Sequence, residues 1–305
     1  MTNHQYNSMH VTFRQLRIFM ALAEQGSVSG AARVCHVTQP TVSMQLRELS
    51  DAVGLPLYEV IGKRLSLTAA GEELARTARA MVDEWSVFGQ RIDAMKGLTR
   101  GRLRVAVVST AKYFIPRMLG DFCRRHPEVD IALEVLNRDG VVQRLRDNRD
   151  DIYIMSQPPR DVEVEQRVFL PNPLVVIAPL GHPLAGAGPV ALQQLAAERF
   201  ILREKGSGTR LACEAFFAEH GMRPPVRMEL GSNEAIKQAV AGGMGLAIVS
   251  RHALGEHLDE EALTVLAVEA FPIQSQWSIV TVKGKRLSPI AQVFLEQLLA
   301  QSGGH

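Results

Sequence analysis

Residues 38–49, TQPTVSMQLREL, carry hydroxyl, amide and guanidinium groups at a spacing suited to reading DNA. At about 100° per residue, one face of a helix would hold the apolar side chains of Val42, Leu46 and Leu49. The opposite face would present Pro40, Ser43, Met44 and Arg47. A recognition helix needs this division, because one face packs on the domain while the other reaches base edges or phosphates in the major groove.

The segments around this stretch predict a helix-turn-helix. Residues 12–26 place apolar side chains at helical spacing, Gly26-Ser27 ends that helix, and residues 29–36 restart one for about two turns. Thr38 is a suitable N-cap for the third helix, and Pro40 suits its first turn because no backbone donor is needed there. After Leu55-Pro56 we expect a short strand pair with Gly62, Lys63 and Arg64 at its tip, where the two cations suit the DNA backbone or minor groove.

Local charge indicates that one copy would bind DNA weakly. Residues 11–66 hold six Lys/Arg (14, 17, 33, 47, 63, 64) against four Asp/Glu (24, 48, 51, 59), a balance of +2, and the whole chain is also only +2. Binding driven by phosphate contacts grows with the number of charges neutralised. Several copies acting together are therefore needed.

A long helix from Thr68 to about Met95 offers a way to pair copies. Its apolar positions are spaced 4, 3, 4, 3, 4, 3, an a/d seam typical of a two-chain coiled coil. A core helix of a large domain shows a similar stripe, so that alternative stays open. The seam consists of Leu74, Ala78, Met81, Trp85, Phe88, Ile92 and Met95. Residues 97–101, GLTRG, then suggest a hinge.

Beyond Gly101 apolar runs of strand length alternate with helical stretches, which predicts parallel sheets covered by helices. About 200 residues suit two small α/β lobes, and ligands would bind beyond the carboxyl ends of their strands. Ser207-Gly208-Thr209 precedes a helix, so free amides and the helix dipole favour an anion there, with charge added by Lys112, Arg203, Lys205 and Arg210. In the alternative, Ser207 or Thr209 only caps the helix and Lys112 and Arg210 belong to a solvated face.

Composition and motifs argue against several other classes. With 305 residues, 46% hydrophobic and 22% charged, the chain suits two or three globular domains, and no apolar run approaches the roughly 18 residues of a membrane span. The polar start MTNHQYNSMH does not resemble a secretory signal, so we expect a cytoplasmic protein.

Cys35, Cys123 and Cys213 lack metal or dithiol spacing. Zincin, Walker and nucleophile-elbow motifs are missing, and Asp150-Asp151 is typical of a turn. We therefore expect no catalysis, no metal and no cofactor.

The stretch FRQLRIFMALAEQGSVSGAARVCHVTQPTVSMQLRELSDAVGLPLYEVIGKRLSLTAAG (residues 13–71) closely resembles the winged helix-turn-helix of LysR-type transcriptional regulators. The resemblance continues over nearly the whole chain. VAVVSTAKYFIPRMLGDFCRRHPEVDIALEVLNRD, DDIYIMSQPP and REKGSGTR are similar to the branch that activates Rubisco operons. Cys35 and Tyr58 replace residues more usual in the family, but neither is a predicted contact.

This resemblance implies a fold class and a division of the chain. It implies an N-terminal all-α winged helix-turn-helix and a long linker helix, followed by a C-terminal α/β domain of two lobes like a periplasmic binding protein. The expected bounds are 11–68 for DNA binding, 69–98 for dimerisation and 102–300 for effector binding. Lobe I would take 102–172 and 271–300, and lobe II 173–268.

The resemblance also implies partners and site residues: operator DNA, a second or further copies in a homodimer or homotetramer, and a small effector that is anionic or phosphorylated. DNA contacts are expected from Thr38, Gln39, Pro40, Thr41, Ser43, Arg47, Lys63 and Arg64. Dimer contacts are expected from Leu74, Met81, Trp85, Phe88 and Ile92. Effector contacts are expected from Ser109, Thr110, Lys112, Asn137, Gln157, Arg203, Ser207, Thr209 and Asn233.

The predicted function is activation of carbon-fixation genes. One alternative is a LysR-type regulator of another pathway, such as aromatic degradation or sulfur or nitrogen metabolism. A second alternative is a solute-binding protein or transferase built on the α/β lobes, against which the N-terminal winged helix argues.

Overall fold

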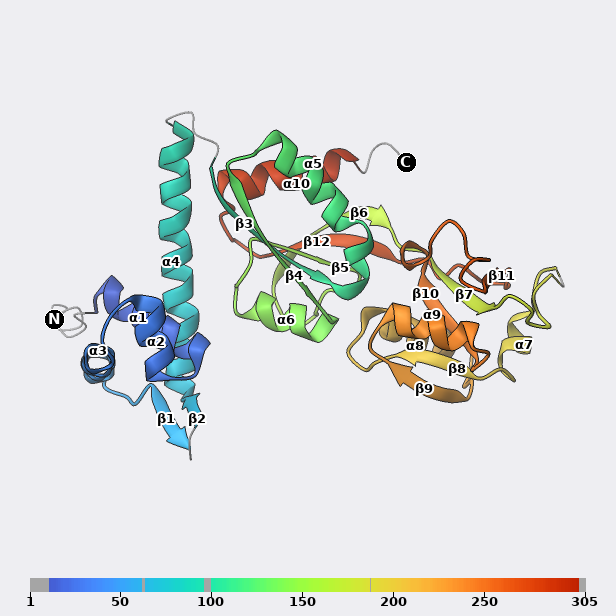
Figure 1. The fold of residues 1–305 in the computed structure, drawn as a ribbon, viewed down its shortest axis with the longest axis horizontal. Coiled ribbons are helices and arrows are strands. Elements are labelled where there is room, and N and C mark those ends of the chain that lie inside the picture. Colours follow the sequence, from blue (N-terminus) through green and yellow to red (C-terminus); the bar gives the residue numbers. More distant parts are fainter. Residues whose placement is uncertain (1–10, 62–63, 96–99, 187, 302–305) are drawn as a thin grey trace, which may run out of the picture. The chain divides into compact units, whose positions relative to one another are not determined.

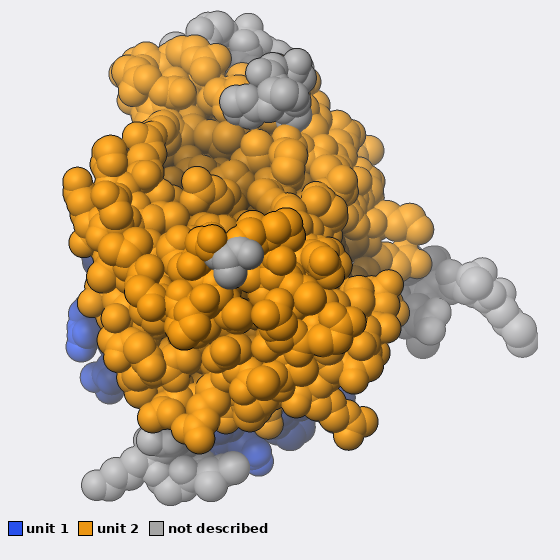
Figure 2. All heavy atoms as spheres, turned by 90° about the vertical axis from the view of Figure 1, so that its right-hand side faces the viewer, with its two compact units in different colours: residues 1–89 blue, residues 90–305 orange. Residues whose placement is uncertain are grey.

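The computed structural model describes residues 11–61, 64–95, 100–186 and 188–301. The chain divides into two compact units, residues 1–89 and 90–305, which Figure 2 distinguishes by colour. Among the described residues no helix is long and apolar enough to cross a membrane.

The first unit contains three short helices, a two-stranded wing and most of a long helix (Figure 1). Thr12 and Gln15 form a capping box at the start of the first helix, and Gly26 ends it with φ +60°, a conformation that glycine adopts without strain. Ser27 and Thr38 cap the next two helices. The elements are α1 (Phe13–Gln25), α2 (Val28–Cys35), α3 (Gln39–Val53), β1 (Tyr58–Ile61), β2 (Arg64–Leu67) and α4 (Ala69–Met95).

The second unit contains two five-stranded sheets, each belonging to one lobe. Lobe I has the order β4-β3-β5-β12-β6, and lobe II has the order β11-β7-β10-β8-β9. Their strands are β3 (Gly101–Val108), β4 (Val129–Leu136), β5 (Ile152–Met155), β6 (Val164–Pro171), β7 (Leu174–Pro179), β8 (Phe200–Arg203), β9 (Val226–Leu230), β10 (Leu246–Ser250), β11 (Leu263–Leu266) and β12 (Gln276–Val282).

The expectation of parallel sheets is correct for only part of each sheet. The strands β4, β3 and β5 are parallel to one another, as are β9, β8 and β10. The strands β12 and β6 extend the first sheet antiparallel, and β7 and β11 extend the second in the same way. The chain passes from lobe I to lobe II after β6 and returns before β12. The strands β7 and β12 are therefore each reached from the other lobe, without the helical crossover that joins consecutive parallel strands of one sheet.

Helices cover both faces of the sheets (Figure 1). In lobe II, alternate residues of β7, β8 and β10 pack on opposite faces. One face carries Phe216 and Phe217 of α8, and the other carries Ile236 and Val240 of α9. The helices are α5 (Ile115–Arg125), α6 (Arg138–Arg146), α7 (Leu192–Leu195), α8 (Gly208–Glu219), α9 (Asn233–Ala241) and α10 (Pro289–Gln301), with short 3-10 turns η1 (Ser109–Tyr113) and η2 (Arg251–Ala253).

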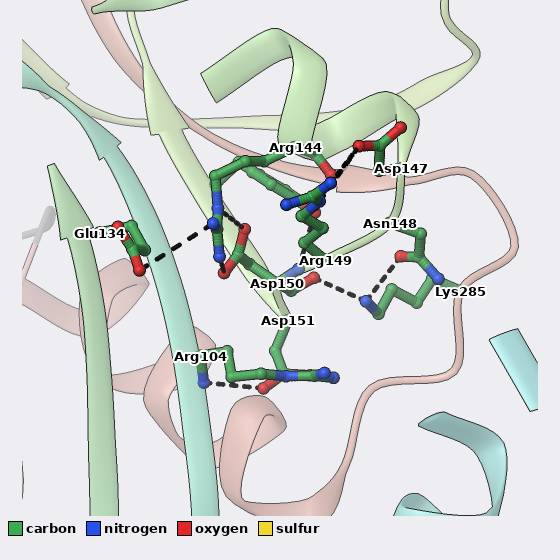
Figure 3. A network of polar contacts seen from close by, with 10 residues as sticks. Arg104, Glu134, Arg144, Asp147, Asn148, Arg149, Asp150, Asp151 and Lys285 are labelled. Carbon is green, nitrogen blue, oxygen red and sulfur yellow. Dashed lines mark hydrogen bonds and ion pairs between the residues drawn. The ribbon is translucent and has the colours of Figure 1, made fainter. Parts of the chain in front are cut away.

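An ion-pair network joins α6 to the start of β5 in lobe I (Figure 3). The guanidinium of Arg144 donates from Nε and Nη2 to the two carboxylate oxygens of Asp150, at 2.8 and 2.7 Å. Lys285 Nζ donates to the Asp150 carbonyl at 2.6 Å, and Asp151 accepts from the Arg104 amide at 2.8 Å. Asp150 and Asp151 are buried. Asp150 and Asp151 directly precede β5, and both carboxylates are structural ion-pair partners.

Candidate DNA-binding and effector-binding sites

The helix α3 has the two faces that its sequence predicts. Val42, Leu46 and Leu49 are fully buried in the core of the first unit. Ser43 and Arg47 are exposed on the other side. The Thr38 hydroxyl accepts from the Thr41 amide at 3.4 Å, which starts the helix where the sequence predicts. The exposed face therefore presents a hydroxyl and a guanidinium above a fixed apolar base, as a major-groove reader requires.

The first residues of α3 and the wing complete this surface as far as the structure describes them. Gln39 and Pro40 are exposed, Thr41 is half-buried, and its hydroxyl shares a 2.8 Å hydrogen bond with that of Thr38. The wing consists of β1 and β2 paired antiparallel, with Ile61 opposite Arg64. Lys63 lies outside the described residues, and for Arg64 only the backbone is described.

The predicted seam on α4 falls into two parts. Ala78 is fully buried and Leu74 is partly buried, and both pack on the core of the first unit. Further along, Met81, Trp85 and Phe88 are 48%, 65% and 51% exposed, and Ile92 is half-buried.

Phe13 of α1 is 40% exposed, and its ring centre lies 6.0 Å from that of Trp85. The ring of Trp85 also packs against that of Phe88, with the ring centres 5.5 Å apart. We call Phe13, Met81, Trp85 and Phe88 the α4 patch.

Within the second unit, polar side chains from both lobes meet at the carboxyl ends of parallel strands. Arg203 ends β8, Ser109 and Thr110 follow β3, and Asn233 begins α9 after β9. Arg203 Nη2 donates to Ser109 Oγ at 3.0 Å, and Nη1 donates to Asn233 Oδ1 at 3.1 Å and to Thr110 Oγ1 at 3.5 Å. Asn233 Nδ2 donates to Thr110 Oγ1 at 3.3 Å. We call this cluster, with Lys112, Tyr113, Glu204 and Glu234, the interlobe site.

Two glutamates of the interlobe site were missed by sequence reasoning. Glu204 receives Arg203 Nε and Nη2 at 2.8 and 2.9 Å, and Glu234 receives Lys112 Nζ at 2.9 Å and the Tyr113 hydroxyl. Burial raises the pKa of Glu234, but hydrogen bonds from Tyr113 and Lys112 outweigh it and lower that pKa to about 2. Burial and the bond to Glu234 raise the pKa of Tyr113. Glu234 is therefore a charged carboxylate at neutral pH.

The other predicted effector residues have more local roles. Ser207 is the N-cap of α8 by position, but its side chain makes no capping hydrogen bond, and both Ser207 and Thr209 are buried. A Cβ added to Gly208 would lie 3.2 Å from Ser156 Oγ and 3.7 Å from the Gln157 side chain, so lobe I approaches the start of α8 there. Asn137 caps α6 by accepting from the Gly140 amide at 2.9 Å.

Arg210 belongs to lobe II rather than to this junction. Its guanidinium donates to Glu214, Glu229 and the Arg203 carbonyl at 2.6, 2.9 and 3.0 Å. Within the described residues no group of His, Cys, Asp and Glu is arranged to hold a metal ion.

Comparison with known protein families finds a matching family for each of the two units. The LysR substrate binding domain matches residues 96–303, and the bacterial regulatory helix-turn-helix protein of the lysR family matches residues 13–72. This chain belongs to the LysR family. The predicted winged helix-turn-helix and two-lobed α/β domain are thereby confirmed as the fold of this LysR protein.

Three similar proteins confirm the narrower resemblance to regulators of carbon fixation. The "RuBisCO operon transcriptional regulator" of Acidithiobacillus ferrooxidans is 47% identical, over 96% of this chain and 95% of that one. The "HTH-type transcriptional activator CmpR" of Synechocystis is 43% identical, over 95% and 96%. The solved regulatory domain of Synechocystis CcmR, "in complex with 2-PG", is 48% identical with a TM-score of 0.65, and it covers 67% of this chain and 99% of that one. None of these LysR relatives is named as an enzyme.

Proposed function

We propose that this LysR protein activates transcription of carbon-fixation genes in response to a small anionic metabolite. Residues 11–68 bind operator DNA, residues 69–98 pair two copies, and residues 102–300 bind the effector. The protein acts in the cytoplasm as a homodimer or homotetramer. The observation that carries the proposal is the exposed face of α3, with Ser43 and Arg47, in a chain 47% identical to a RuBisCO operon regulator.

The α4 patch supports pairing of two copies. Four large apolar side chains gather on one exposed stretch of α1 and α4, where they would otherwise contact water. A second copy of the same helix would bury them by the same seam. The DNA-binding domain of one copy carries only a small positive charge, which is too little for tight operator binding. Pairing brings two such domains to the operator and doubles that charge.

The interlobe site supports an effector that carries negative charge. Hydroxyl, amide and guanidinium groups from two lobes meet where strand ends converge, the usual ligand position in open α/β sheets. The CcmR domain with 2-PG, 48% identical, makes 2-PG the first ligand to test. We assign Ser109, Thr110, Lys112, Arg203 and Asn233 to this site, with Gln157, Ser207 and Thr209 beside the start of α8 and Asn137 at the start of α6.

Genome-wide binding-site sequencing, followed by footprinting of the purified protein on the strongest sites, tests the proposal. We expect footprints upstream of carbon-fixation genes and a change in their extent or in DNA bending when 2-PG is added. Footprints upstream of other pathways would keep a LysR regulator but overturn the carbon-fixation assignment. A protein that binds ligand and gives no sequence-specific footprint would instead be a solute-binding protein.

A further inference from the structure

Met44 lies near the middle of the exposed face of α3. At about 100° per residue, its direction is within roughly 15° of the point opposite Val42, Leu46 and Leu49, which are fully buried. Arg47 lies about 45° to one side of that point. Because the buried face packs on the domain, Met44 is the side chain that α3 presents most directly to a surface lying across from it.

Met44 lies outside the core of the first unit, as far as the structure describes that core. Its side chain is 52% exposed, and it is not among the apolar residues that pack there. The neighbouring Gln45 Nε2 donates to Glu48 Oε2 at 2.8 Å, and the same oxygen accepts from Nε2 of the buried Gln15 of α1 at 3.1 Å. These bonds join α3 to α1 and hold the helix in one rotation, with Met44 facing outwards.

The major groove of DNA projects one apolar group, the 5-methyl group of thymine. The other base edges present hydrogen-bond donors and acceptors. A methionine placed against a polar edge removes water from it without replacing the hydrogen bond, and this costs free energy. Against the thymine methyl group, two apolar groups leave water together, and the flexible thioether chain can adjust its shape to fit. A methionine in the groove therefore favours thymine over the other three bases.

We propose that Met44 contacts the 5-methyl group of one thymine in each operator half-site and thereby selects thymine at that position. This inference rests on the proposed function, in which α3 binds operator DNA. Arg47 follows three residues later on the same face, so its guanidinium would reach a base close to that thymine. The two side chains read different bases, because arginine pairs with guanine and the methionine contact depends on a methyl group.

The test measures how tightly the full-length protein binds operators in which single thymines are replaced by deoxyuridine. The starting operator is the strongest site in the wild-type footprints, and fluorescence anisotropy gives the dissociation constants. Deoxyuridine keeps the hydrogen-bonding edge of thymine and lacks only the 5-methyl group. Losing the burial of one methyl group should weaken binding about threefold to fivefold. We expect this loss at one thymine of each half-site for the wild type, and no loss at the same thymine for Met44→Ala.

Three further variants test whether the effect belongs to the Met44 side chain. Met44→Leu keeps an apolar side chain of similar volume, so it should keep part of the deoxyuridine effect. Met44→Gln offers the amide that pairs with adenine, so it should favour adenine over thymine at that position. The matched control is Leu55→Ala, which truncates a side chain that is 56% exposed just after the end of α3. Its response to deoxyuridine should equal that of the wild type.

The outcomes separate this inference from the proposed function. A specific footprint in which no thymine responds to deoxyuridine overturns the inference and leaves the proposed function standing. A thymine that stays equally sensitive in Met44→Ala also overturns it, since another residue then contacts the methyl group. Sensitivity that disappears in Met44→Ala supports it, even where the footprints lie upstream of genes outside carbon fixation. A wild type that gives no specific footprint overturns both.

Discussion

Arg47 is the residue that we propose reads the operator sequence. It is exposed on α3, one turn beyond Ser43, while the opposite face of the helix is fixed by fully buried leucines. A guanidinium donates two parallel hydrogen bonds to guanine in the major groove, a pairing that depends on the base. Lys63 lies outside the described residues, and we propose that it contacts phosphate instead, where charge acts without regard to sequence.

Arg47→Ala should therefore cost about 1–3 kcal/mol of operator binding and relax discrimination against altered sites. Lys63→Ala should weaken all sequences alike and lower the slope of affinity against salt by about one unit. Titrations of both variants on matched and mutated operators at several salt concentrations separate the two effects. Unchanged discrimination by Arg47→Ala would show that another part of α3 reads the bases.

Glu234 should also give the protein a characteristic response to acid. Its pKa falls from the ordinary value of 4.5 to about 2 in the folded protein, so its contribution to stability is complete above about pH 4.5 and is lost as pH falls towards 2. The difference in free energy of unfolding between wild type and Glu234→Gln should be constant from pH 7 to 5 and shrink below 4.5. Urea titrations at pH 7, 5 and 3 measure it. A difference that persists undiminished at pH 3 would contradict the Tyr113 and Lys112 contacts.

At this scale, local patterns in the sequence predict more than long-range pairings. Thr38 as N-cap and the buried face of α3 follow from spacing within one helix, and the structure agrees. Glu234 could not be assigned from sequence, because its partner Lys112 lies 122 residues away in the other lobe. The carboxylate that neutralises Arg203 belongs to the next residue, Glu204, so this pairing is local in the sequence and was nevertheless not predicted.

Among the elements, α4 combines a packed half with an exposed half. Its heptad pattern is continuous in sequence, yet Ala78 is buried in the first unit while Trp85 is exposed. Spacing alone cannot distinguish these uses of one stripe, since helix packing within a domain and between chains needs the same periodicity. The antiparallel strands β6 and β11 were likewise not predicted, because alternation along the chain does not reveal where it crosses between lobes.

Trp85→Asp should shift the protein towards monomer and abolish tight operator binding. Trp85 is the largest side chain of the α4 patch, and a charge there would be buried without a partner in the pair. The monomer should still fold, because the position is exposed in one copy. Sedimentation velocity measures the mass. Ser86→Asp adds the same charge at the next exposed position and should stay paired. A dimeric Trp85→Asp would place the main pairing surface in residues 102–300.

The junction of α6 and β5 should depend on Asp150 for its stability. Its carboxylate is 1% exposed and neutralises Arg144 through two hydrogen bonds. Without Asp150 the partly buried guanidinium of Arg144 keeps only the Glu134 carboxylate, 4.0 Å away, so Asp150→Ala should destabilise the protein by about 3 kcal/mol. The matched control is Asp161→Ala, which breaks the exposed Arg146–Asp161 pair and should leave the urea midpoint unchanged. Equal midpoints for both variants would mean that the network of Figure 3 adds no stability.

For the whole molecule, regulation requires that effector binding in one unit changes DNA binding in the other. The chain forms two compact units, and the segment predicted as a hinge, residues 97–101, lies largely outside the described residues. The thermodynamics do not depend on the path between the units. If 2-PG changes operator affinity by some factor, operator DNA must change 2-PG affinity by the same factor. The effect cannot exceed the difference in 2-PG affinity between the two states.

We therefore expect the operator dissociation constant with and without saturating 2-PG to change by about 5- to 150-fold. The 2-PG dissociation constant with and without saturating operator should change by the same factor. Fluorescence anisotropy gives the first constant and calorimetry the second. Thr110→Val removes the hydroxyl that accepts from Arg203 and Asn233, so it should weaken 2-PG binding. At a fixed 2-PG concentration, the ratio of the operator dissociation constants with and without 2-PG should then move towards one. If 2-PG shifts operator affinity while operator leaves 2-PG affinity unchanged, 2-PG must act on DNA binding through a different site or through assembly of further copies.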